Sequence, residues 1–307
     1  MTAPTRVAGI DCGTNSIRLL IADARADGTL IDVVREMQIV RLGQDVDRTG
    51  RLAPEAIERT RVALAGYAAA IARHDAQRVR MTATSATRDA VNRDDFVQMV
   101  VATLGVAPEV ITGADEAALS FRGAVAGLPR LQTPVLVADI GGGSTEVVLG
   151  NGALRAHSMN VGCVRMTERH LHGDPPTADQ IGAAVRDVRA AIVQAAADVP
   201  IRSAATFVGV AGTVTTLAAI ALGLDSYDAD AIHGSTMTAE QVADVTQQLL
   251  AMTRDERAAL PVMHPGRVDV IGAGALVLRT LMEQVGAAEV VVSEHDILDG
   301  IAMSLLD

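Results

Sequence analysis

The apolar and polar residues along the chain follow two patterns, which occur in turn. Short runs rich in valine, isoleucine and leucine indicate strands, whereas apolar residues that recur every three or four positions indicate helices. In the first half the pattern predicts strands over residues 7–10, 17–22, 30–40, 78–83 and 109–111. It predicts helices over residues 54–73, 94–104 and 115–126, and Pro54 suits the first turn of its helix.

The second half repeats this arrangement. Its predicted strands are residues 135–140, 147–150, 154–160, 206–210 and 290–292. Its predicted helices are residues 163–170, 177–196, 214–221, 239–250 and 268–285. Strand meanders followed by alternating helices and strands predict an α/β protein with a mixed sheet in each half.

A segment rich in glycine, proline and polar residues, 127–134, is the predicted linker between the halves. The predicted domains are therefore residues 1–127 and 128–307. A duplicated α/β unit is expected to hold its ligand in the cleft between its halves.

Two predicted hairpins carry nearly the same turn. Each follows an apolar run, opens with an aspartate, Asp11 or Asp139, and continues with glycine and hydroxyl residues into a second apolar run. Glycine lets a turn bring its N–H groups close to an anion, and such groups bind phosphate with nearby hydroxyls. The predicted phosphate-binding residues are Gly13, Thr14, Asn15 and Ser16 in one turn and Gly141, Gly142, Gly143, Ser144 and Thr145 in the other.

A single turn of this kind also occurs for purely local reasons, because aspartate and glycine are common turn residues. Two copies in equivalent contexts favour function. An aspartate faces a phosphate without repulsion only when a divalent cation lies between them, so the pair predicts a phosphate site with a magnesium position.

Composition narrows the possible functions. The 307 residues are 49% hydrophobic and only 2% aromatic, which predicts aliphatic cores. A net charge of −11 argues against general nucleic-acid binding. The chain contains no lysine, so a Walker-type P-loop and a protein-kinase strand lysine are both excluded.

The expected location is the cytoplasm. The first residues contain no apolar signal region, and no apolar stretch is long enough to cross a bilayer, so no membrane partner is expected. Cys12 and Cys163 have no partner spacing and are expected to be small packing residues in a reducing compartment.

Several further segments, together with the paired Asp-Gly hairpins, resemble one family within the actin/Hsp70/sugar-kinase superfamily. Residues 83–92 resemble a signature of the exopolyphosphatase/guanosine-pentaphosphate phosphohydrolase (Ppx/GppA) family. Residues 112–119 resemble its Ser/Thr-Gly-x-Glu-Glu-Ala segment, with Asp115 in place of the first acid. Residues 209–213 resemble its third glycine-rich strand end, and His233-Gly234 a later element.

The resemblance covers essentially the whole chain and implies the short, two-domain type. It implies two actin-like (ribonuclease H-like) domains with mixed sheets flanked by helices and an active site in the interdomain cleft. Residues 272–274 lie where the superfamily would contact adenosine. Residues 292–300 depart from the usual pattern, so a family contact by that loop is not expected.

The resemblance also implies that Glu116 is the general base that orients and deprotonates water. From the residues alone, the helix dipole is the favoured explanation of an acid in the first turn of a helix, and it is our interpretation of Asp115.

Asp139 is the first candidate for Mg²⁺, with Mn²⁺ as an alternative, followed by Glu146 and Asp11. Glu146 is equally interpreted as an outward-facing strand residue.

Arg88 and Arg18 are candidates for gripping phosphate, because arginine binds phosphate oxygens in a bidentate fork. A surface ion pair is the alternative for each. Gly212 and Thr213 are expected to extend the phosphate-binding rim. His170 and His172 lack a third ligand at a supporting spacing and are interpreted as exposed helix-end residues.

The leading hypothesis is a magnesium-dependent exopolyphosphatase that releases orthophosphate from the end of inorganic polyphosphate. Hydrolysis of the 5′ γ-phosphate of guanosine pentaphosphate, within the stringent response, is the rival, and the same residues serve both. The few aromatic residues lie outside the phosphate-binding motifs, which favours polyphosphate, and the short family type favours short chains. A sugar kinase or actin-like ATP-binding protein and a non-enzymatic alarmone sensor are the remaining alternatives. A homodimer is expected from the family.

Overall fold

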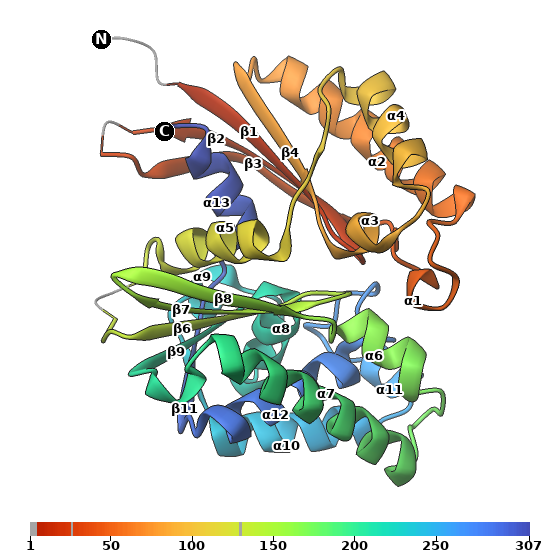
Figure 1. Cartoon of the computed structure of the whole chain (residues 1–307), viewed down its shortest axis with the longest axis vertical. Coiled ribbons are helices and arrows are strands. Elements are labelled where there is room, and N and C mark those ends of the chain that lie inside the picture. Colours follow the sequence, from red (N-terminus) through yellow and green to blue (C-terminus); the bar gives the residue numbers. More distant parts are fainter. Residues whose placement is uncertain (1–4, 26, 129–130) are drawn as a thin grey trace. The chain divides into compact units, whose positions relative to one another are not determined.

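The computed structural model describes residues 5–25, 27–128 and 131–307 (Figure 1). The chain forms two compact units. Unit 1 comprises Met1–Gly123 together with Ile297–Asp307, and unit 2 comprises Ala124–Asp296. Part of the predicted linker, residues 129–130, lies outside the described residues.

Unit 1 is built on a five-stranded sheet of order β3-β2-β1-β4-β5. The strands are β1 (Arg6–Cys12), β2 (Ser16–Ala24), β3 (Leu30–Ile39), β4 (Arg78–Ala83) and β5 (Glu109–Val110). The first three pair antiparallel, and β4 and β5 run parallel to β1, so the sheet is mixed. β1 and β4 therefore have their carboxyl ends at the same edge of the sheet.

Helices cover both faces of this sheet (Figure 1). On one face lie α2 (Pro54–Arg73) and α4 (Arg93–Leu104), whose buried residues join the sheet in a hydrophobic core that includes Leu64 and Tyr67. On the other face lie α5 (Gly113–Val125) and α13 (Ile297–Ser304). The short helices α1 (Val46–Thr49) and α3 (Ser85–Asp89) complete the unit.

The C-terminal segment differs from the sequence-based expectation in two respects. Residues 297–304 form a helix rather than a loop, and this helix packs with unit 1 rather than with residues 128–296. A Cβ on Gly9 would lie 3.2 Å from the Ala302 nitrogen, and one on Gly300 would collide with the Leu119 carbonyl. Gly300 weakens the helical pattern in the sequence, yet only glycine permits this close packing.

Unit 2 contains a six-stranded sheet of order β10-β11-β9-β6-β7-β8. The strands are β6 (Val135–Ile140), β7 (Thr145–Asn151), β8 (Ala153–Met159), β9 (Thr206–Val210), β10 (Thr236–Thr238) and β11 (Glu289–Val292). β6, β9 and β11 are parallel neighbours, whereas β7, β8 and β10 pair antiparallel.

The helices of unit 2 are α6 (Cys163–His170), α7 (Ala178–Asp198), α8 (Ala211–Ala221), α9 (Ala229–Ile232), α10 (Ala239–Ala251), α11 (Arg254–Ala258) and α12 (Ile271–Val285), with a 3₁₀ turn at Ile201–Ser203. Most residues of α12 are buried, and α6, α7, α8 and α10 pack against it.

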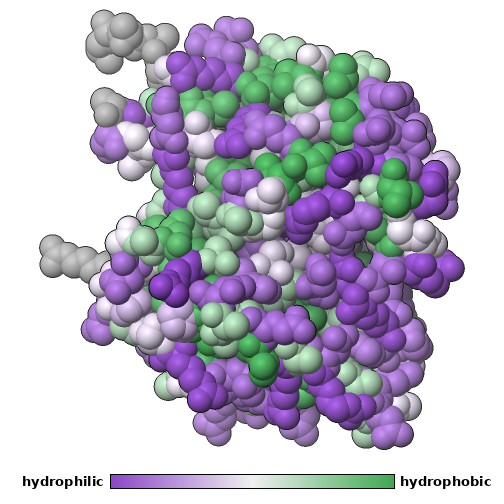
Figure 2. Space-filling view, in the orientation of Figure 1, coloured by the Kyte–Doolittle hydropathy of each residue, from purple (hydrophilic) through white to green (hydrophobic). Residues whose placement is uncertain are grey.

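The two mixed sheets flanked by helices confirm the predicted fold class. The pattern missed α1, α3, α9, α11 and β10, because segments of three to five residues are too short for a periodic signal. On the face shown in Figure 2, apolar residues are interspersed with hydrophilic ones. Within the described part of the chain, no helix is both long and apolar enough to cross a bilayer.

Candidate functional site

The turn between β1 and β2 closes with a hydrogen bond from the Gly13 N–H to the Ser16 carbonyl, 2.9 Å long. We call this β1–β2 hairpin, with its turn, hairpin 1. Thr14 at its tip is only 6% exposed, and its buried hydroxyl has no hydrogen-bond partner among the described residues. A buried hydroxyl in this position fits a ligand oxygen, because burial without a partner is costly. The Thr14 hydroxyl of hairpin 1 is therefore a candidate ligand for a bound anion.

Asp11 and Arg18 lie opposite each other in hairpin 1 and form an ion pair. Arg18 Nη2 lies 2.7 Å and Nε 3.1 Å from Asp11 Oδ2, and the Asp11 side chain is nearly buried. From the sequence we expected Arg18 to bind phosphate and Asp11 to bind the metal. The structure brings the two together, so each already has a neighbour of opposite charge.

Glu116 lies in the first turn of α5 and is only 7% exposed. Arg88, on α3, donates from Nη1 to Glu116 Oε2 at 2.9 Å and to the Ile111 carbonyl at 3.2 Å. This charge-assisted hydrogen bond fixes the orientation of the Glu116 carboxylate. Burial distinguishes Glu116 from its neighbour Asp115, which is exposed and accepts a hydrogen bond from the Thr112 hydroxyl.

Hydrogen bonding places hairpin 1 next to α3, the helix that bears Arg88. The Thr84 N–H, just beyond β4, donates to the Cys12 carbonyl at the end of β1. A Cβ on Gly13 would lie 4.0 Å from the Thr84 hydroxyl oxygen. Hairpin 1 and the N-terminus of α3 are thus neighbours at one edge of the sheet of unit 1.

The turn between β6 and β7 has the same closure, from the Gly141 N–H to the Ser144 carbonyl at 3.0 Å. We call this β6–β7 hairpin, with its turn, hairpin 2. Asp139 and Glu146 lie directly opposite each other, so their side chains share one face of the sheet. They are 6% and 1% exposed, and Glu146 Oε1 accepts a 2.6 Å hydrogen bond from the Ser158 hydroxyl. The interpretation of Glu146 as an outward-facing residue is therefore wrong.

Two buried carboxylates side by side suit a hard divalent cation, which prefers oxygen ligands and offsets their mutual repulsion. Asp139 and Glu146 are thus the residues of hairpin 2 that could hold the metal. Among the described residues, no group of three or more histidine, cysteine, aspartate or glutamate side chains has metal-binding geometry. An ion held by this pair would complete its coordination with water or substrate oxygens.

Residues at the N-terminus of α6 donate hydrogen bonds to the carbonyl groups in the turn of hairpin 2. The N–H groups of Cys163 and Val164 donate to the carbonyls of Gly141 and Gly142, and buried Arg165 donates from Nε to the Gly143 carbonyl at 2.6 Å. A Cβ on Gly162 would lie 2.5 Å from the Gly142 oxygen, so only glycine fits there.

The carbonyl groups of this turn are therefore occupied. The N–H groups of Gly142 and Gly143 donate to no described residue, which leaves them for an anion. Thr145 differs from its expected role, because its buried hydroxyl donates to the Val161 carbonyl.

An arginine that the sequence analysis missed lies against the rim formed by Gly212 and Thr213. A Cβ on Gly212 would lie 2.2 Å from Arg267 Nη2, so the guanidinium group rests on the glycine backbone. Arg267 Nη1 also donates to the Thr216 hydroxyl at 2.8 Å. Because β9 pairs with β6 in parallel, this rim follows directly beside hairpin 2.

The thiol of Cys163 also lies at this rim. Burial raises the pKa of Cys163 to about 11, while a hydrogen bond with Thr213 and the charge of Arg267 act in the opposite direction. Cys163 is therefore a protonated packing residue at neutral pH, as expected from the sequence.

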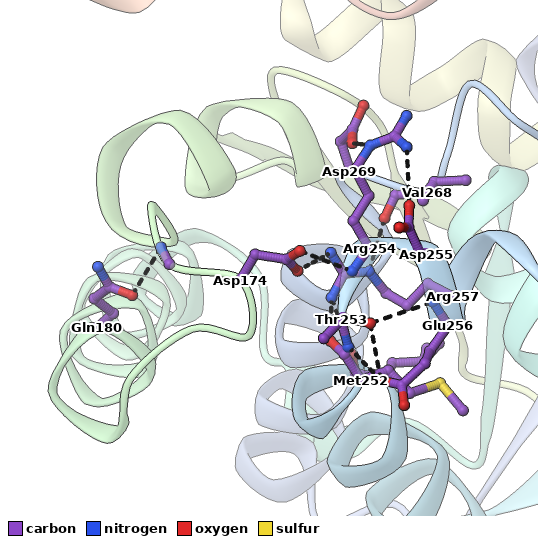
Figure 3. A network of polar contacts seen from close by, with 12 residues as sticks. Asp174, Gln180, Met252, Thr253, Arg254, Asp255, Glu256, Arg257, Val268 and Asp269 are labelled. Atoms are coloured by element: carbon purple, nitrogen blue, oxygen red, sulfur yellow. Dashed lines mark hydrogen bonds and ion pairs between the residues drawn. The ribbon is translucent and has the colours of Figure 1, made fainter.

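A polar network fixes the segment that bears Arg267 (Figure 3). Buried Arg257 donates from Nε to the Val268 carbonyl at 2.9 Å and pairs with Asp174 at 3.2 Å. Arg254 pairs with Asp269 at 2.8 Å. These contacts join α11 to the residues on the C-terminal side of Arg267 and to Asp174, which is about 80 residues earlier in the chain. No local motif therefore indicated them.

Of the two histidines predicted to be exposed, only one is. His172 is exposed, whereas His170 is half-buried and its Nε2 lies 2.9 Å from Asp187. His233 Nδ1 accepts a hydrogen bond from the Glu294 N–H, and its ring meets that of His295 edge-on. Gly274, where an adenosine contact was expected, packs against the Thr213 side chain.

The chain is similar to known proteins over its whole length. The Ppx/GppA phosphatase family matches residues 20–307. Exopolyphosphatase 2 of Mycobacterium tuberculosis is 56% identical, over 99% of each chain. The crystal structure of an exopolyphosphatase-like protein is 47% identical, with a TM-score of 0.94 over 98% of this chain and 97% of that one.

The crystal structure of the Aquifex aeolicus Ppx/GppA family member is 31% identical, with a TM-score of 0.80 over 98% of this chain and 97% of that chain. The match in fold extends through both sheets, as the resemblance of the motifs implied. The chain belongs to the Ppx/GppA phosphatase family and has its actin-like fold.

Proposed function

We propose that this protein is an exopolyphosphatase that hydrolyses the terminal phosphoanhydride bond of inorganic polyphosphate and releases orthophosphate. The full-length similarity to an exopolyphosphatase supports the substrate. The observation that carries the chemistry is the buried Glu116 carboxylate, held by Arg88 at 2.9 Å. A carboxylate in one fixed orientation suits a general base better than a freely rotating one.

In the proposed mechanism, Glu116 orients the attacking water and accepts its proton. Hairpin 1 binds phosphate oxygens through its turn, including the Thr14 hydroxyl. Hairpin 2 binds phosphate oxygens through the N–H groups of Gly142 and Gly143, and Arg267 supplies positive charge at the adjacent rim. Phosphoryl transfer depends mainly on such positioning and charge neutralisation.

Asp139 and Glu146 are proposed to hold the divalent cation. When bound, this ion neutralises charge on the transferred phosphoryl group. We expect Mg²⁺, with Mn²⁺ as a substitute. A homodimer, a cytoplasmic location and a link to the stringent response are further parts of this proposal and derive from the family resemblance and composition.

The test is a phosphate-release assay with tripolyphosphate, long-chain polyphosphate, guanosine pentaphosphate, ATP and ADP, with and without Mg²⁺. We expect polyphosphate to be the preferred substrate. Glu116→Gln should lower kcat at least about 100-fold, the usual contribution of a general base. Asp115→Asn is the matched control, because it removes an exposed acid from the same helical turn, and it should stay within about twofold of the native rate.

Native turnover in Glu116→Gln would remove this residue from the mechanism. Cleavage of guanosine pentaphosphate without cleavage of polyphosphate would assign the chain to the rival activity.

A further inference from the structure

Three neighbouring parallel strands of unit 2 end at the same edge of the sheet. Asp139 of β6 pairs with Val210 of β9, and Val292 of β11 pairs with Gly209. The residues that follow these strands therefore form a row: the turn of hairpin 2, then the Gly212 rim, then Glu294. Ligands of open α/β sheets bind at the carboxyl ends of the strands, so all three stand where a substrate would lie.

Glu294 is held in this row at both its backbone and its side chain. Its N–H donates to His233 Nδ1 at 3.2 Å, and its Oε1 accepts a 2.6 Å hydrogen bond from the Tyr227 hydroxyl. The same hydroxyl lies 2.7 Å from the Thr215 hydroxyl on α8. Tyr227 thus ties the carboxylate to the helix that begins at the Gly212 rim.

The Tyr227 phenol senses the charges of both Glu294 and Arg267. Burial, followed by the Glu294 charge, raises the pKa of the Tyr227 phenol, and the Arg267 charge acts against this rise. Along the row, the arginine that attracts phosphate is thus followed by a carboxylate that repels it. Adjacent strands lie about 4.8 Å apart, so the row spans roughly 10 Å.

We propose that Glu294, held by Tyr227, is a specificity-determining residue that disfavours phosphate groups beyond the Arg267 position and so favours short polyphosphate chains over long ones. This inference rests on the proposed function. A chain with few phosphate groups ends before the carboxylate, whereas a long chain must pass it or turn away from it.

The experiment compares binding of tripolyphosphate and long-chain polyphosphate by calorimetry, in the Glu116→Gln background so that neither ligand is consumed. Glu294→Gln removes the charge but can still accept the Tyr227 hydrogen bond. We expect it to shift the ratio of the two Kd values about tenfold in favour of the long chain, with a smaller shift at high salt.

Glu289→Gln is the matched control, because Glu289 is exposed at the opposite end of β11 and its replacement removes the same charge. It should leave the ratio unchanged. Tyr227→Phe keeps the carboxylate but removes its hydrogen bond from the Tyr227 hydroxyl, so it should shift the ratio in the same direction by a smaller factor.

An equal ratio in Glu294→Gln and Glu289→Gln overturns the inference. Tight binding without hydrolysis by the chain that retains Glu116 would overturn the proposed function alone. Binding of neither ligand would overturn both.

Discussion

Hairpins 1 and 2 have the same type of turn but differ in the charge of their side chains. Each closes with a hydrogen bond across a four-residue turn, and each places an aspartate two residues before that turn. The residue opposite the aspartate is Arg18 in hairpin 1 and Glu146 in hairpin 2. One exchange of residue type thus separates a charge-compensated hairpin from an acidic one.

This difference in charge indicates which hairpin is better suited to bind a cation. In hairpin 1 the Asp11 charge is offset by Arg18 at 2.7 Å, so a metal would compete with a guanidinium group already in place. In hairpin 2 two carboxylates share one face and gain from a shared cation. We therefore infer that the metal belongs to Asp139 and Glu146, and that the expected role of Asp11 as a metal ligand is the weakest of the three.

The largest effect should come from removing one acid of hairpin 2. Asp139→Asn is expected to lower kcat/KM for tripolyphosphate about 100-fold and to raise the Mg²⁺ concentration for half-maximal rate at least about tenfold. Titration of phosphate release with Mg²⁺ measures both quantities. Glu146→Gln should shift the Mg²⁺ requirement in the same direction.

Asp11→Asn is the matched variant in hairpin 1. Its activity should fall less, and its half-maximal Mg²⁺ concentration should not change. Equal shifts in the Asp11 and Asp139 variants would break the contrast between the hairpins.

A moderate effect on stability should show that the turn of hairpin 2 is more tightly packed than that of hairpin 1. Gly162→Ala places a Cβ 2.5 Å from the Gly142 carbonyl oxygen and 2.7 Å from the Ser144 nitrogen. Because backbone must move to accept it, we expect the free energy of unfolding to fall by about 2 kcal/mol in urea titrations.

Gly13→Ala is the comparison, because its Cβ would meet no atom closer than 3.6 Å. Its unfolding free energy should change by less than about 1 kcal/mol. A Gly162→Ala protein as stable as the native one would show that hairpin 2 does not depend on the close contact with α6.

The smallest effect concerns two buried cysteines, Cys12 at the end of β1 in hairpin 1 and Cys163 at the start of α6, which packs against the turn of hairpin 2. Burial raises the pKa of Cys163 to about 11 and also raises that of Cys12, so both thiols are neutral and buried near pH 7. Since the thiolate is the reactive form, iodoacetamide should label neither residue in the native protein and both after unfolding. Mass spectrometry of timed samples gives the result.

The sign of the pH effect on stability follows from the same shifts. The unfolded thiols ionise near their ordinary pKa of 9.0, whereas the folded ones stay protonated to higher pH. Unfolding should therefore become easier as the pH rises above about 9. Rapid native labelling of Cys163 at pH 7 would contradict its protected environment.

The local elements were largely predictable from the sequence. The helix Pro54–Arg73, the strand Arg78–Ala83 and both hairpin turns lie where the pattern predicted them. Their signals, apolar periodicity and turn residues, are contained within a few consecutive positions. Glu116 was singled out by the family resemblance of residues 112–119, and only the structure distinguished its buried carboxylate from that of exposed Asp115.

Local patterns and composition were enough to predict the fold class, two Asp-Gly hairpin turns and the absence of lysine chemistry, because each depends on neighbouring residues or on the residue types present. Tertiary structure alone decided that Arg267 rests on Gly212, that Tyr227 holds Glu294, and that α13 packs with unit 1. These contacts join residues far apart in the chain, and their geometry arises only when helices and strands pack. Long-range charge and close packing are properties of the folded chain, and they leave no periodic signal in the order of its residues.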